Sequence, residues 1–301
     1  MLCFFAFAGR NGQIINLLLG IFGKERKMEN FRNQNEIGEK EVLVVSFGTT
    51  FAETRQKTIG AIEEAVEKAF PDWSVRRAFT SGMIRSRLAN RDGIEIDGPE
   101  EALERAVRNG VKELIVQPTH LMDGREYNKL MEILARYVPR FEKVSVGLPL
   151  LSSPEDFTAV AAAIRNHLPV EEENTAVVLM GHGTDVPSNA VYAEMQSVLN
   201  EGDEDEQEYF IGTVEGTPTV TDILTEIWNS AMYLDIVLAP FMIVAGDHAT
   251  NDLAGDEEES WKTIFINHGY RVTTQLQGIG EWPEIRELFA KHALEAVPYH
   301  I

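Results

Sequence analysis

The feature that most constrains the fold is a strict alternation of predicted strands and helices that runs through the chain twice. From Val42 onward, short apolar runs rich in β-branched residues alternate with segments of helical periodicity. Strands that alternate with helices form parallel sheets with helices on both faces. The sequence therefore predicts an α/β protein.

Each round contains four predicted strands. In the first round they are EVLVVSFGTT, WSVRRAF, ELIVQPTHL and KVSVGLPLL. In the second they are TAVVLMGHGT, EYFIGTVEGTP, DIVLAPFMIV and RVTTQL, and WPEIRELFAKHAL is a closing helix. Proline near the start of several intervening segments, such as Pro99 and Pro154, is typical of the first turn of a helix.

The two rounds match each other at the ends of their strands. SFGT matches GHGT, which places Phe47 opposite His182, and QPTHLMDGRE matches APFMIVAGDH, which places Glu126 opposite His248. We expect an internal duplication: two βα sandwich halves, each with a four-stranded parallel sheet, that face each other across a cleft. Ligands of such sheets bind beyond the carboxyl ends of the strands, where these matching segments lie.

We divide the chain into three parts, and the last carries the predicted ligand site. They are a leader at 1–40 that does not belong to the fold, a first half at 41–170 and a second half at 171–301.

The leader contains two short apolar runs, neither of which reaches the roughly 18 apolar residues of a membrane span. Its basic residues Lys24, Arg26 and Lys27 follow the apolar runs, whereas a signal peptide has them in front. We predict a segment outside the fold, or one that precedes the true start. A weak membrane anchor or an export signal is the alternative.

The charge balance excludes two classes of partner. The chain has 48 acidic and 27 basic residues and a formal net charge of -21. Nucleic acids and anionic membranes bind basic surfaces, so neither is expected as a partner. The single cysteine, Cys3, excludes a disulfide framework and a cysteine metal site. We predict a cytoplasmic protein without a stable membrane span.

Three side chains with metal-binding chemistry follow three strands of the second half. His182 and His248 each lie beside or near glycine just after an apolar run, and Glu215 lies at the matching place on a third strand. Two imidazole nitrogens and one carboxylate oxygen suit a divalent ion such as Co²⁺, Ni²⁺, Fe²⁺ or Zn²⁺. The alternative is that His182 caps the next helix and the other two are separate surface residues. The remaining histidines have structural explanations: His167, His268, His292 and His300.

The segment AGDHATND is strongly acidic around His248. Asp247 and Asp252 favour either an acidic approach for a cation or carboxylates that orient the imidazole of His248. The alternative is the solvated start of a helix, where acidic residues are common, and we favour that alternative for residues 256–259.

The first half offers candidate contacts for an acidic ligand. His120, Glu126 and Tyr127 follow its third strand. Arginines gather in this half and either bind ligand carboxylates or form an ordinary basic surface. They are Arg76, Arg77, Arg85, Arg87, Arg91 and Arg125, of which we favour Arg85, Arg87 and Arg125. The chain has no P-loop, nucleophile elbow, HExxH or Rossmann fingerprint.

Several long segments, taken in order, resemble the anaerobic, class II sirohydrochlorin cobaltochelatases of the chelatase superfamily. They are VVSFGTTF, RAFTSGMI, RDGIEIDGPEEAL, GLPLLSS, MGHGT, TVEGTP and MIVAGDHATNDLAGDEEESWK. The resemblance covers residues 41 to 296, nearly everything after the leader. It implies the chelatase fold, two similar α/β halves around a cleft, which agrees with the duplication.

The resemblance implies a lyase that inserts Co²⁺ into sirohydrochlorin during anaerobic cobalamin biosynthesis. It implies that the metal is held by His182, Glu215 and His248, and it associates Glu126 with the site less firmly. We expect His182 and His248 to be catalytic, with His182 as the main base. Contacts to the macrocycle are predicted at Phe47, Gly48, Thr49, Arg85, Arg87, His120, Arg125 and Glu126.

Co²⁺ is then a substrate metal, and no organic cofactor is expected. Some relatives bind haem, but only His120 in the first half offers a candidate ligand, so haem is not supported. The sequence does not decide whether the chain forms a homo-oligomer. The alternatives are a chelatase for Fe²⁺ or Ni²⁺ on the same macrocycle, a non-catalytic protein that binds metal or tetrapyrrole, and a metal-dependent hydrolase, for which a carboxylate base motif is missing.

Overall fold

The structure is a computed structural model that describes residues 32, 38–169, 174–201 and 209–300. The predicted leader falls almost wholly outside these residues. Within the described part of the chain, no helix is long and apolar enough to cross a membrane.

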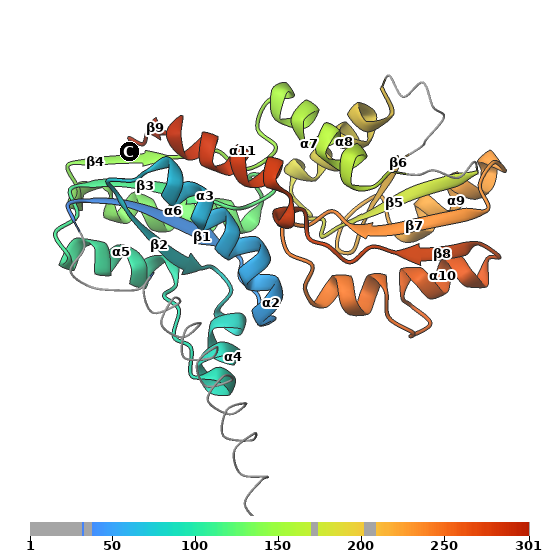
Figure 1. The fold of residues 1–301 in the computed structure, drawn as a ribbon, viewed down its shortest axis with the longest axis horizontal. Coiled ribbons are helices and arrows are strands. Elements are labelled where there is room, and N and C mark those ends of the chain that lie inside the picture. Colours follow the sequence, from blue (N-terminus) through green and yellow to red (C-terminus); the bar gives the residue numbers. More distant parts are fainter. Residues whose placement is uncertain (1–31, 33–37, 170–173, 202–208, 301) are drawn as a thin grey trace, which may run out of the picture.

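The first half is built on a sheet with the strand order β2-β1-β3-β4-β9 (Figure 1). The central strand β1 is buried along almost its whole length, because an apolar run such as Val42–Val45 has helices on both sides. β1 pairs in parallel with β2 and β3, and β3 with β4. The bounds are β1 Lys40–Ser46, β2 Ser74–Phe79, β3 Glu113–Pro118 and β4 Lys143–Val146.

The second half repeats this arrangement with a sheet of order β6-β5-β7-β8. In both sheets the first strand of the round is central, with the second strand on one side and the third and fourth on the other. All pairings in this sheet are parallel. The α/β fold with two similar halves is thereby confirmed. The bounds are β5 Thr175–Gly181, β6 Tyr209–Thr213, β7 Asp235–Pro240 and β8 Arg271–Thr274.

Helices cover both sheets, and most begin at a proline, serine or threonine. Ser153 and Thr219, for example, accept backbone N–H groups of the first turns of α7 and α9. The helices are α2 Ala52–Arg55, α3 Ala61–Ala69, α4 Gly82–Asp92, α5 Pro99–Arg108, α6 Arg125–Tyr137, α7 Pro154–His167, α8 Val191–Asn200, α9 Val220–Ser230, α10 Trp261–Asn267 and α11 Pro283–Leu294.

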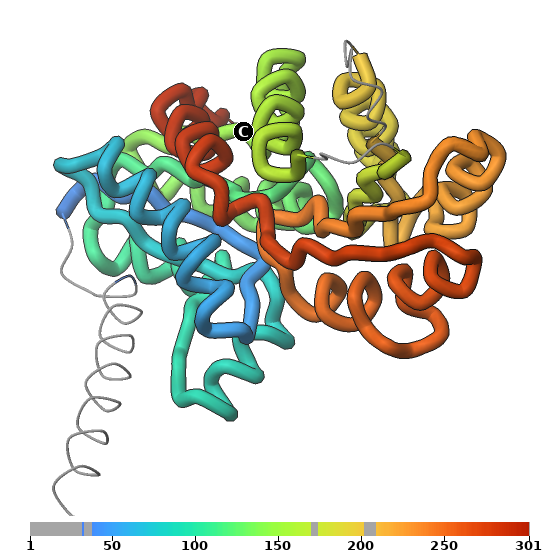
Figure 2. The backbone as a smooth tube through the Cα atoms, turned by 45° about the vertical axis from the view of Figure 1, so that its right-hand side comes forward, coloured from blue at the N-terminus to red at the C-terminus, as the bar shows by residue number. Residues whose placement is uncertain are grey.

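The end of the chain returns to the first half, which the alternation did not predict. α11 packs beside α3, and the short strand β9 (Val297–Pro298) pairs antiparallel with β4, so the first sheet has five strands and is not wholly parallel (Figure 2). His292 of α11 fastens this return. Its Nε2 lies 3.0 Å from Asp156 Oδ1 and its Nδ1 lies 3.2 Å from the Leu148 carbonyl. The division at 170/171 stays a prediction.

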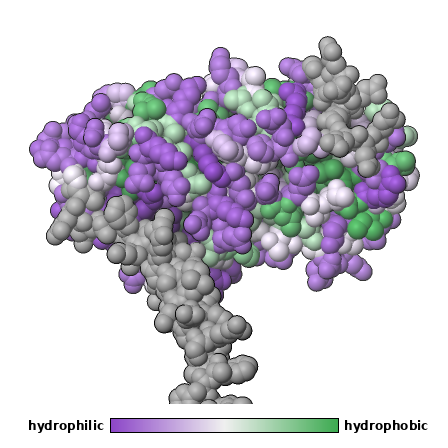
Figure 3. All heavy atoms as spheres, viewed as in Figure 1, coloured by the Kyte–Doolittle hydropathy of each residue, from purple (hydrophilic) through white to green (hydrophobic). Residues whose placement is uncertain are grey.

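One apolar core joins the two halves. Its buried residues include Ile62 of α3, Phe157 of α7, Leu179 of β5, Ala239 of β7 and Phe289 of α11. Because these residues belong to both rounds of the chain, the two sheets are held in a fixed relation. The face of the molecule shown in Figure 3 is mostly hydrophilic, and apolar side chains gather over the second half.

Candidate active site at the strand ends of the second half

The structure brings His182, Glu215 and His248 together. His182 directly follows β5, Glu215 follows β6, and His248 lies in the segment after β7, so all three lie at the carboxyl end of one sheet. The imidazole centroids of His182 and His248 are 4.9 Å apart, with the rings nearly perpendicular. His182 Nδ1 lies 3.9 Å from Glu215 Oε2. Three segments far apart in sequence therefore converge, as the strand-end pattern predicted.

Backbone hydrogen bonds join the segments that carry His182 and Glu215. The Glu215 N–H donates to the His182 carbonyl at 2.8 Å, and the Val214 N–H donates to the Gly181 carbonyl at 3.1 Å. The pairing of β5 with β6 thus continues past the last residue of each strand. Glu215 is held beside His182 by the backbone, while its carboxylate stays exposed.

The two positions beside His182 must be glycine, because neighbouring atoms leave no space for a side chain there. A Cβ on Gly181 would lie 2.2 Å from the ring of Tyr192, and one on Gly183 would lie 2.6 Å from the Gly216 nitrogen. Gly183 also has a φ of +81°, where a side chain is strained. The glycines let the chain turn tightly between Tyr192 and the Glu215 segment, and His182 is left exposed at the turn.

Two further residues that sequence analysis did not single out hold this turn. Tyr192 accepts the Gly183 N–H through its hydroxyl at 3.1 Å. Asn189 accepts the Thr184 N–H at 3.0 Å and donates to the Thr217 carbonyl at 2.7 Å, so it links the segments after β5 and β6. Nothing in the local sequence around either residue indicates this role.

Asp252 orients His248. The two lie one turn apart where the chain enters a short helical segment, Ala249–Leu253, and Asp252 Oδ2 is hydrogen-bonded to His248 Nδ1. His182 Nδ1 similarly lies 3.1 Å from the Gly183 carbonyl. A ring whose Nδ1 donates to an oxygen keeps the lone pair on Nε2. Of the two explanations for the acidic segment, Asp252 fits the orienting carboxylate.

The arrangement of the three candidate ligands is open. Among the described residues, no group of three or more His, Cys, Asp or Glu side chains is arranged so that it could hold a metal ion. His182 and Glu215 are exposed, and His248 is partly exposed.

The segment that leads to His248 rests on the first half. Val244 packs against the apolar cluster formed by Ile59, Phe79, Leu88 and Ile96 of the first half, and a Cβ on Gly246 would lie 4.0 Å from Thr49 Oγ1. The segment after β7 that carries His248 therefore lies against the first half, close to the segment after β1. The two halves meet beside the candidate ligands.

The predicted macrocycle contacts after β1 differ in exposure. Phe47 is 50% exposed, whereas Gly48 and Thr49 are buried. Thr49 Oγ1 accepts the Phe51 N–H at 3.2 Å, and the Thr49 carbonyl accepts Arg55 Nη1 at 3.1 Å. Phe47 is the side chain of this segment that can touch a ligand, while Gly48 and Thr49 shape the turn.

The contacts predicted after β3 occupy the start of α6 and the residues before it. Glu126 lies in the first turn of α6 and is half-buried. The ring of His120 packs edge-on against Tyr127 at 6.5 Å, and both its nitrogens are buried without a hydrogen-bond partner among the described residues. Burial lowers the pKa of His120 to about 4, so this imidazole is neutral at physiological pH.

The three favoured arginines have different surroundings. Arg85 Nη1 donates to Glu101 Oε2 at 2.6 Å, and the guanidinium packs over Gly98. Arg125 forms an exposed ion pair with Asp185, which joins α6 to the segment after β5. Arg87 is exposed, and within the described residues it has no ion pair or hydrogen bond.

Arg76 and Arg77 are neither surface cations nor ligand contacts, which corrects both explanations offered for them. Their exposed fractions are 2% and 5%. Arg77 makes a bidentate ion pair with Glu63 at 2.6 and 2.7 Å, while Arg76 Nε donates to the Arg32 carbonyl. The alternation of WSVRRAF predicted the strand but did not indicate that both faces are covered at the arginines.

Three of the four remaining histidines have the structural roles expected of them. His167 stacks on Trp282 at 4.7 Å and His292 fastens α11. His268 Nδ1 lies 2.8 Å from the Ile264 carbonyl at the end of α10.

Comparisons of the sequence with known proteins agree on one family. Residues 40–298 match the family model described as cobalt chelatase (CbiK). A sirohydrochlorin cobaltochelatase of Salmonella typhimurium is 38% identical over 262 residues, which cover 86% of this chain and 97% of that protein. The sirohydrochlorin cobaltochelatase CbiKC of Nitratidesulfovibrio vulgaris is 32% identical over 262 residues, with 86% and 91% covered.

Solved structures share the fold at low sequence identity. SirB from Bacillus subtilis with Fe³⁺ superposes with a TM-score of 0.59 at 18% identity, covering 85% of this chain and 94% of that one. The sirohydrochlorin chelatase SirB from Bacillus subtilis subspecies spizizenii in complex with cobalt gives 0.58 at 17% identity, with the same coverage. These likenesses establish a chelatase-like arrangement of the two halves.

Proposed function

The chain belongs to the cobalt chelatase (CbiK) family, and from this membership and the geometry of the site we propose that it is a sirohydrochlorin cobaltochelatase. The reaction takes one metal-free macrocycle and one Co²⁺ ion. It gives the cobalt complex and two protons, which come from two pyrrole N–H groups. We place this step in anaerobic cobalamin biosynthesis, in the cytoplasm.

We assign His182 and His248 the removal of pyrrole protons and, with Glu215, the holding of the ion. The observation that carries this assignment is the convergence of the two imidazoles, 4.9 Å apart, each with Nδ1 facing an oxygen. The lone pair on Nε2 can bind the metal or accept a pyrrole proton. A ring that holds the ion releases it when the macrocycle nitrogens replace the imidazole.

Glu215 supplies an oxygen ligand of opposite charge to the ion. An oxygen and two nitrogens bind a borderline divalent ion less firmly than thiolates do, and the chain has only one cysteine. Weak holding suits a metal that is a substrate, because the ion must leave with the product. The open arrangement around the exposed Glu215 carboxylate supports such a transfer.

The first half would hold the macrocycle. Phe47 lies at the strand end that matches that of His182, and its exposed ring offers a flat apolar contact for the tetrapyrrole. Glu126 matches His248 and remains a candidate for the same cleft. Gly48, Thr49 and His120 lie beside these contacts and shape the surface more than they touch the ligand.

The test is an anaerobic insertion assay with sirohydrochlorin and Co²⁺, followed by the change in visible absorption. We expect insertion by the wild type well above the rate without protein. His182→Ala should lose it, by about a hundredfold or more, since a positioned base contributes about 10²–10⁴-fold. His268→Ala, an exposed histidine of the same half, is the matched control.

Two outcomes would contradict the proposal. Full insertion by His182→Ala would remove that residue from the mechanism. A wild type that binds Co²⁺ or macrocycle but does not exceed the rate without protein would be a non-catalytic binding protein. The same assay with Fe²⁺ and Ni²⁺ decides between metals, because two imidazoles and a carboxylate do not discriminate strongly among these ions.

A further inference from the structure

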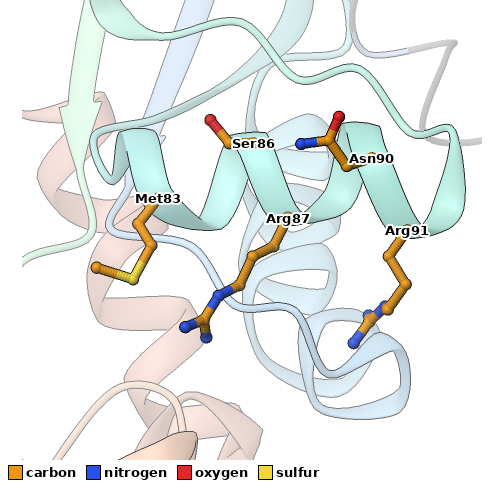
Figure 4. Close-up of a pocket in the computed structure, with 5 residues that line it drawn as sticks. All are labelled: Met83, Ser86, Arg87, Asn90 and Arg91. Atoms are coloured by element: carbon orange, nitrogen blue, oxygen red, sulfur yellow. The ribbon is translucent and has the colours of Figure 1, made fainter.

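The helix α4 of the first half carries a pocket whose lining side chains are all exposed. The pocket has a volume of about 320 Å³ and is lined by Met83, Ser86, Arg87, Asn90 and Arg91. Figure 4 shows the side chains of Met83, Arg87 and Arg91 directed to one side of the helix. Their spacing of four residues places them on one helical face.

Arg87 provides the uncommitted positive charge of this face. Arg91 donates to both oxygens of Asp92 and to the Thr50 carbonyl at 2.7 Å, so its guanidinium is already engaged. Arg85 is engaged by Glu101. Arg87 has no such partner in the described part of the chain, although the protein carries a net charge of -21. An exposed guanidinium is a ready partner for a carboxylate, which it can bind through two parallel hydrogen bonds.

The position of α4 connects this pocket to the candidate active site. On its buried face, Leu88 lies in one apolar cluster with Phe79, and Val244 packs against that cluster. Val244 belongs to the segment that leads to His248. On its outer side, Arg91 holds the carbonyl of Thr50, in the segment that begins with Phe47. The helix therefore contacts the segment that carries Phe47 directly and shares an apolar cluster with the segment that carries His248.

We propose that this pocket binds a peripheral carboxylate side chain of the tetrapyrrole substrate, with Arg87 as the anion-binding residue and Met83 as an apolar contact. The proposal rests on the cobaltochelatase function proposed above. Sirohydrochlorin carries acetate and propionate groups around its rim, so a macrocycle held between the halves presents carboxylates to the surrounding helices. Met83 is 66% exposed, and its flexible thioether suits the irregular edge of such a ligand.

Arg87 would thereby act on binding and selectivity and not on proton removal. A carboxylate paired with Arg87 offsets part of the long-range repulsion between an anionic substrate and a strongly acidic protein. A tetrapyrrole without carboxylates at that edge would lose this contact.

The experiment measures binding of metal-free sirohydrochlorin, followed by absorption or by quenching of tryptophan fluorescence over a range of salt concentrations. The variants are Arg87→Ala and Arg87→Lys. The matched control is Arg108→Ala, because Arg108 is an exposed arginine at the end of α5, near the amino ends of the strands. Titration of each variant with Co²⁺ alone serves as a second readout.

We expect Arg87→Ala to raise the dissociation constant of the macrocycle about tenfold, the scale of one hydrogen-bonded charge. Its salt dependence should also weaken, since one screened ion pair is lost. The dissociation constant of Arg87→Lys should lie between those of the wild type and Arg87→Ala. Macrocycle binding by Arg108→Ala, and Co²⁺ binding by every variant, should match the wild type. Unchanged affinity and salt dependence in Arg87→Ala would overturn the inference about this pocket but not the proposed cobaltochelatase function. A wild type that binds the macrocycle but inserts no metal would overturn the proposed function and leave this result standing.

Discussion

The two halves of the molecule have the same sheet topology but different chemistry at their strand ends. Both sheets place the first strand of their round at the centre, with the second strand on one side and the third and fourth on the other. The second half carries His182 and His248 where the first carries Phe47 and Glu126. The duplicated scaffold therefore provides two equivalent rims, one at the carboxyl ends of the strands of each sheet, and the side chains there distinguish the two rims.

The two rims also share the same backbone conformation at the turn after the central strand. Gly48 has a φ of +102° and Gly183 a φ of +81°, and a Cβ at either position would meet a neighbour at 2.6 Å. The neighbour is the ring of Phe79 in the first half and the backbone of Gly216 in the second. Both halves thus present the preceding side chain on the same kind of turn, so Phe47 and His182 can be exchanged as a direct test.

His182→Phe gives the second half the residue of the first and should have the largest effect. His182 is about half exposed, so a phenyl ring should be tolerated without loss of folding. We expect the insertion rate to fall about a thousandfold, because a base and a metal ligand are both lost. The insertion rate measured at saturating macrocycle tests the loss of the base. Calorimetry of Co²⁺ binding tests the loss of the metal ligand.

The reciprocal change, Phe47→His, is the control. We expect it to leave the number of Co²⁺ ions bound per chain unchanged, because both ring nitrogens of His120, the histidine that follows the neighbouring strand β3, are buried and do not face an ion. A second bound ion would show that one histidine on the turn is enough, and the comparison between the rims would fail.

The two central strands also differ at a buried position. Glu41 of β1 is 1% exposed, and β5 has the buried Ala176 at the matching place. Burial raises the pKa of Glu41 to about 7, although the nearby Arg76 acts in the opposite direction. The folded protein therefore retains a proton on this carboxyl that the unfolded chain releases above its ordinary pKa of 4.5.

Between pH 4.5 and about 7, this group makes the free energy of unfolding fall as pH rises. The loss is at most about 1.4 kcal/mol per pH unit, or about 3 kcal/mol over the window. Above pH 7 the penalty stays constant. In Glu41→Gln the slope should flatten, as measured by urea unfolding across this range. Glu39→Gln, at an exposed carboxylate, should keep the wild-type slope. Identical slopes in Glu41→Gln would mean that Glu41 titrates normally.

The positions four residues after Glu126 and His248 sharpen the comparison further. Leu130 is buried in the core of the first half, whereas Asp252 is hydrogen-bonded to His248. Asp252→Asn should weaken Co²⁺ binding about tenfold to a hundredfold, the range found when a carboxylate that orients a ligating histidine is removed. Macrocycle affinity should not change.

Asp247→Asn is the matched control, because Asp247 pairs with Asn251 and not with the imidazole. If both substitutions weaken Co²⁺ binding equally, the acidic segment acts through its total charge. In that case Asp252 does not orient His248.

The strand ends were predictable from sequence because parallel strands bring their carboxyl ends to one edge. That rule placed His182, Glu215 and His248 together, and the structure gives 4.9 Å between the two rings. The alternation also predicted the duplicated α/β fold. These inferences depend on local periodicity and on a general property of parallel sheets.

Features that depend on contacts between distant residues were not predictable. Asn189 and Tyr192 hold the His182 turn through hydrogen bonds that no local pattern signals. The return of α11 to the first half depends on the His292 contact with Asp156, 136 residues earlier in the chain. Arg76 and Arg77 looked like surface cations because a buried arginine has the same sequence signature as an exposed one until its partners are known.

Arg125 should have the smallest effect of the predicted macrocycle contacts, because its charge is already matched. It lies in the first turn of α6 in the first half and pairs with Asp185, just after His182, in the second. The hydrogen bond to Arg125 holds the pKa of Asp185 below its ordinary value, so the pair stays ionised near neutral pH. Both side chains are about two-thirds exposed, and exposed pairs contribute little.

Arg125→Ala should therefore raise the apparent KM for the macrocycle by about twofold at most, with kcat unchanged. Asp185→Ala should act in the opposite direction, because it frees the guanidinium of Arg125 for a substrate carboxylate. The double variant should resemble Arg125→Ala. Steady-state kinetics at low and physiological salt would separate these cases. A large rise in KM for Arg125→Ala alone would mean that the macrocycle displaces Asp185 from the arginine, and that the ion pair between the halves opens when substrate binds.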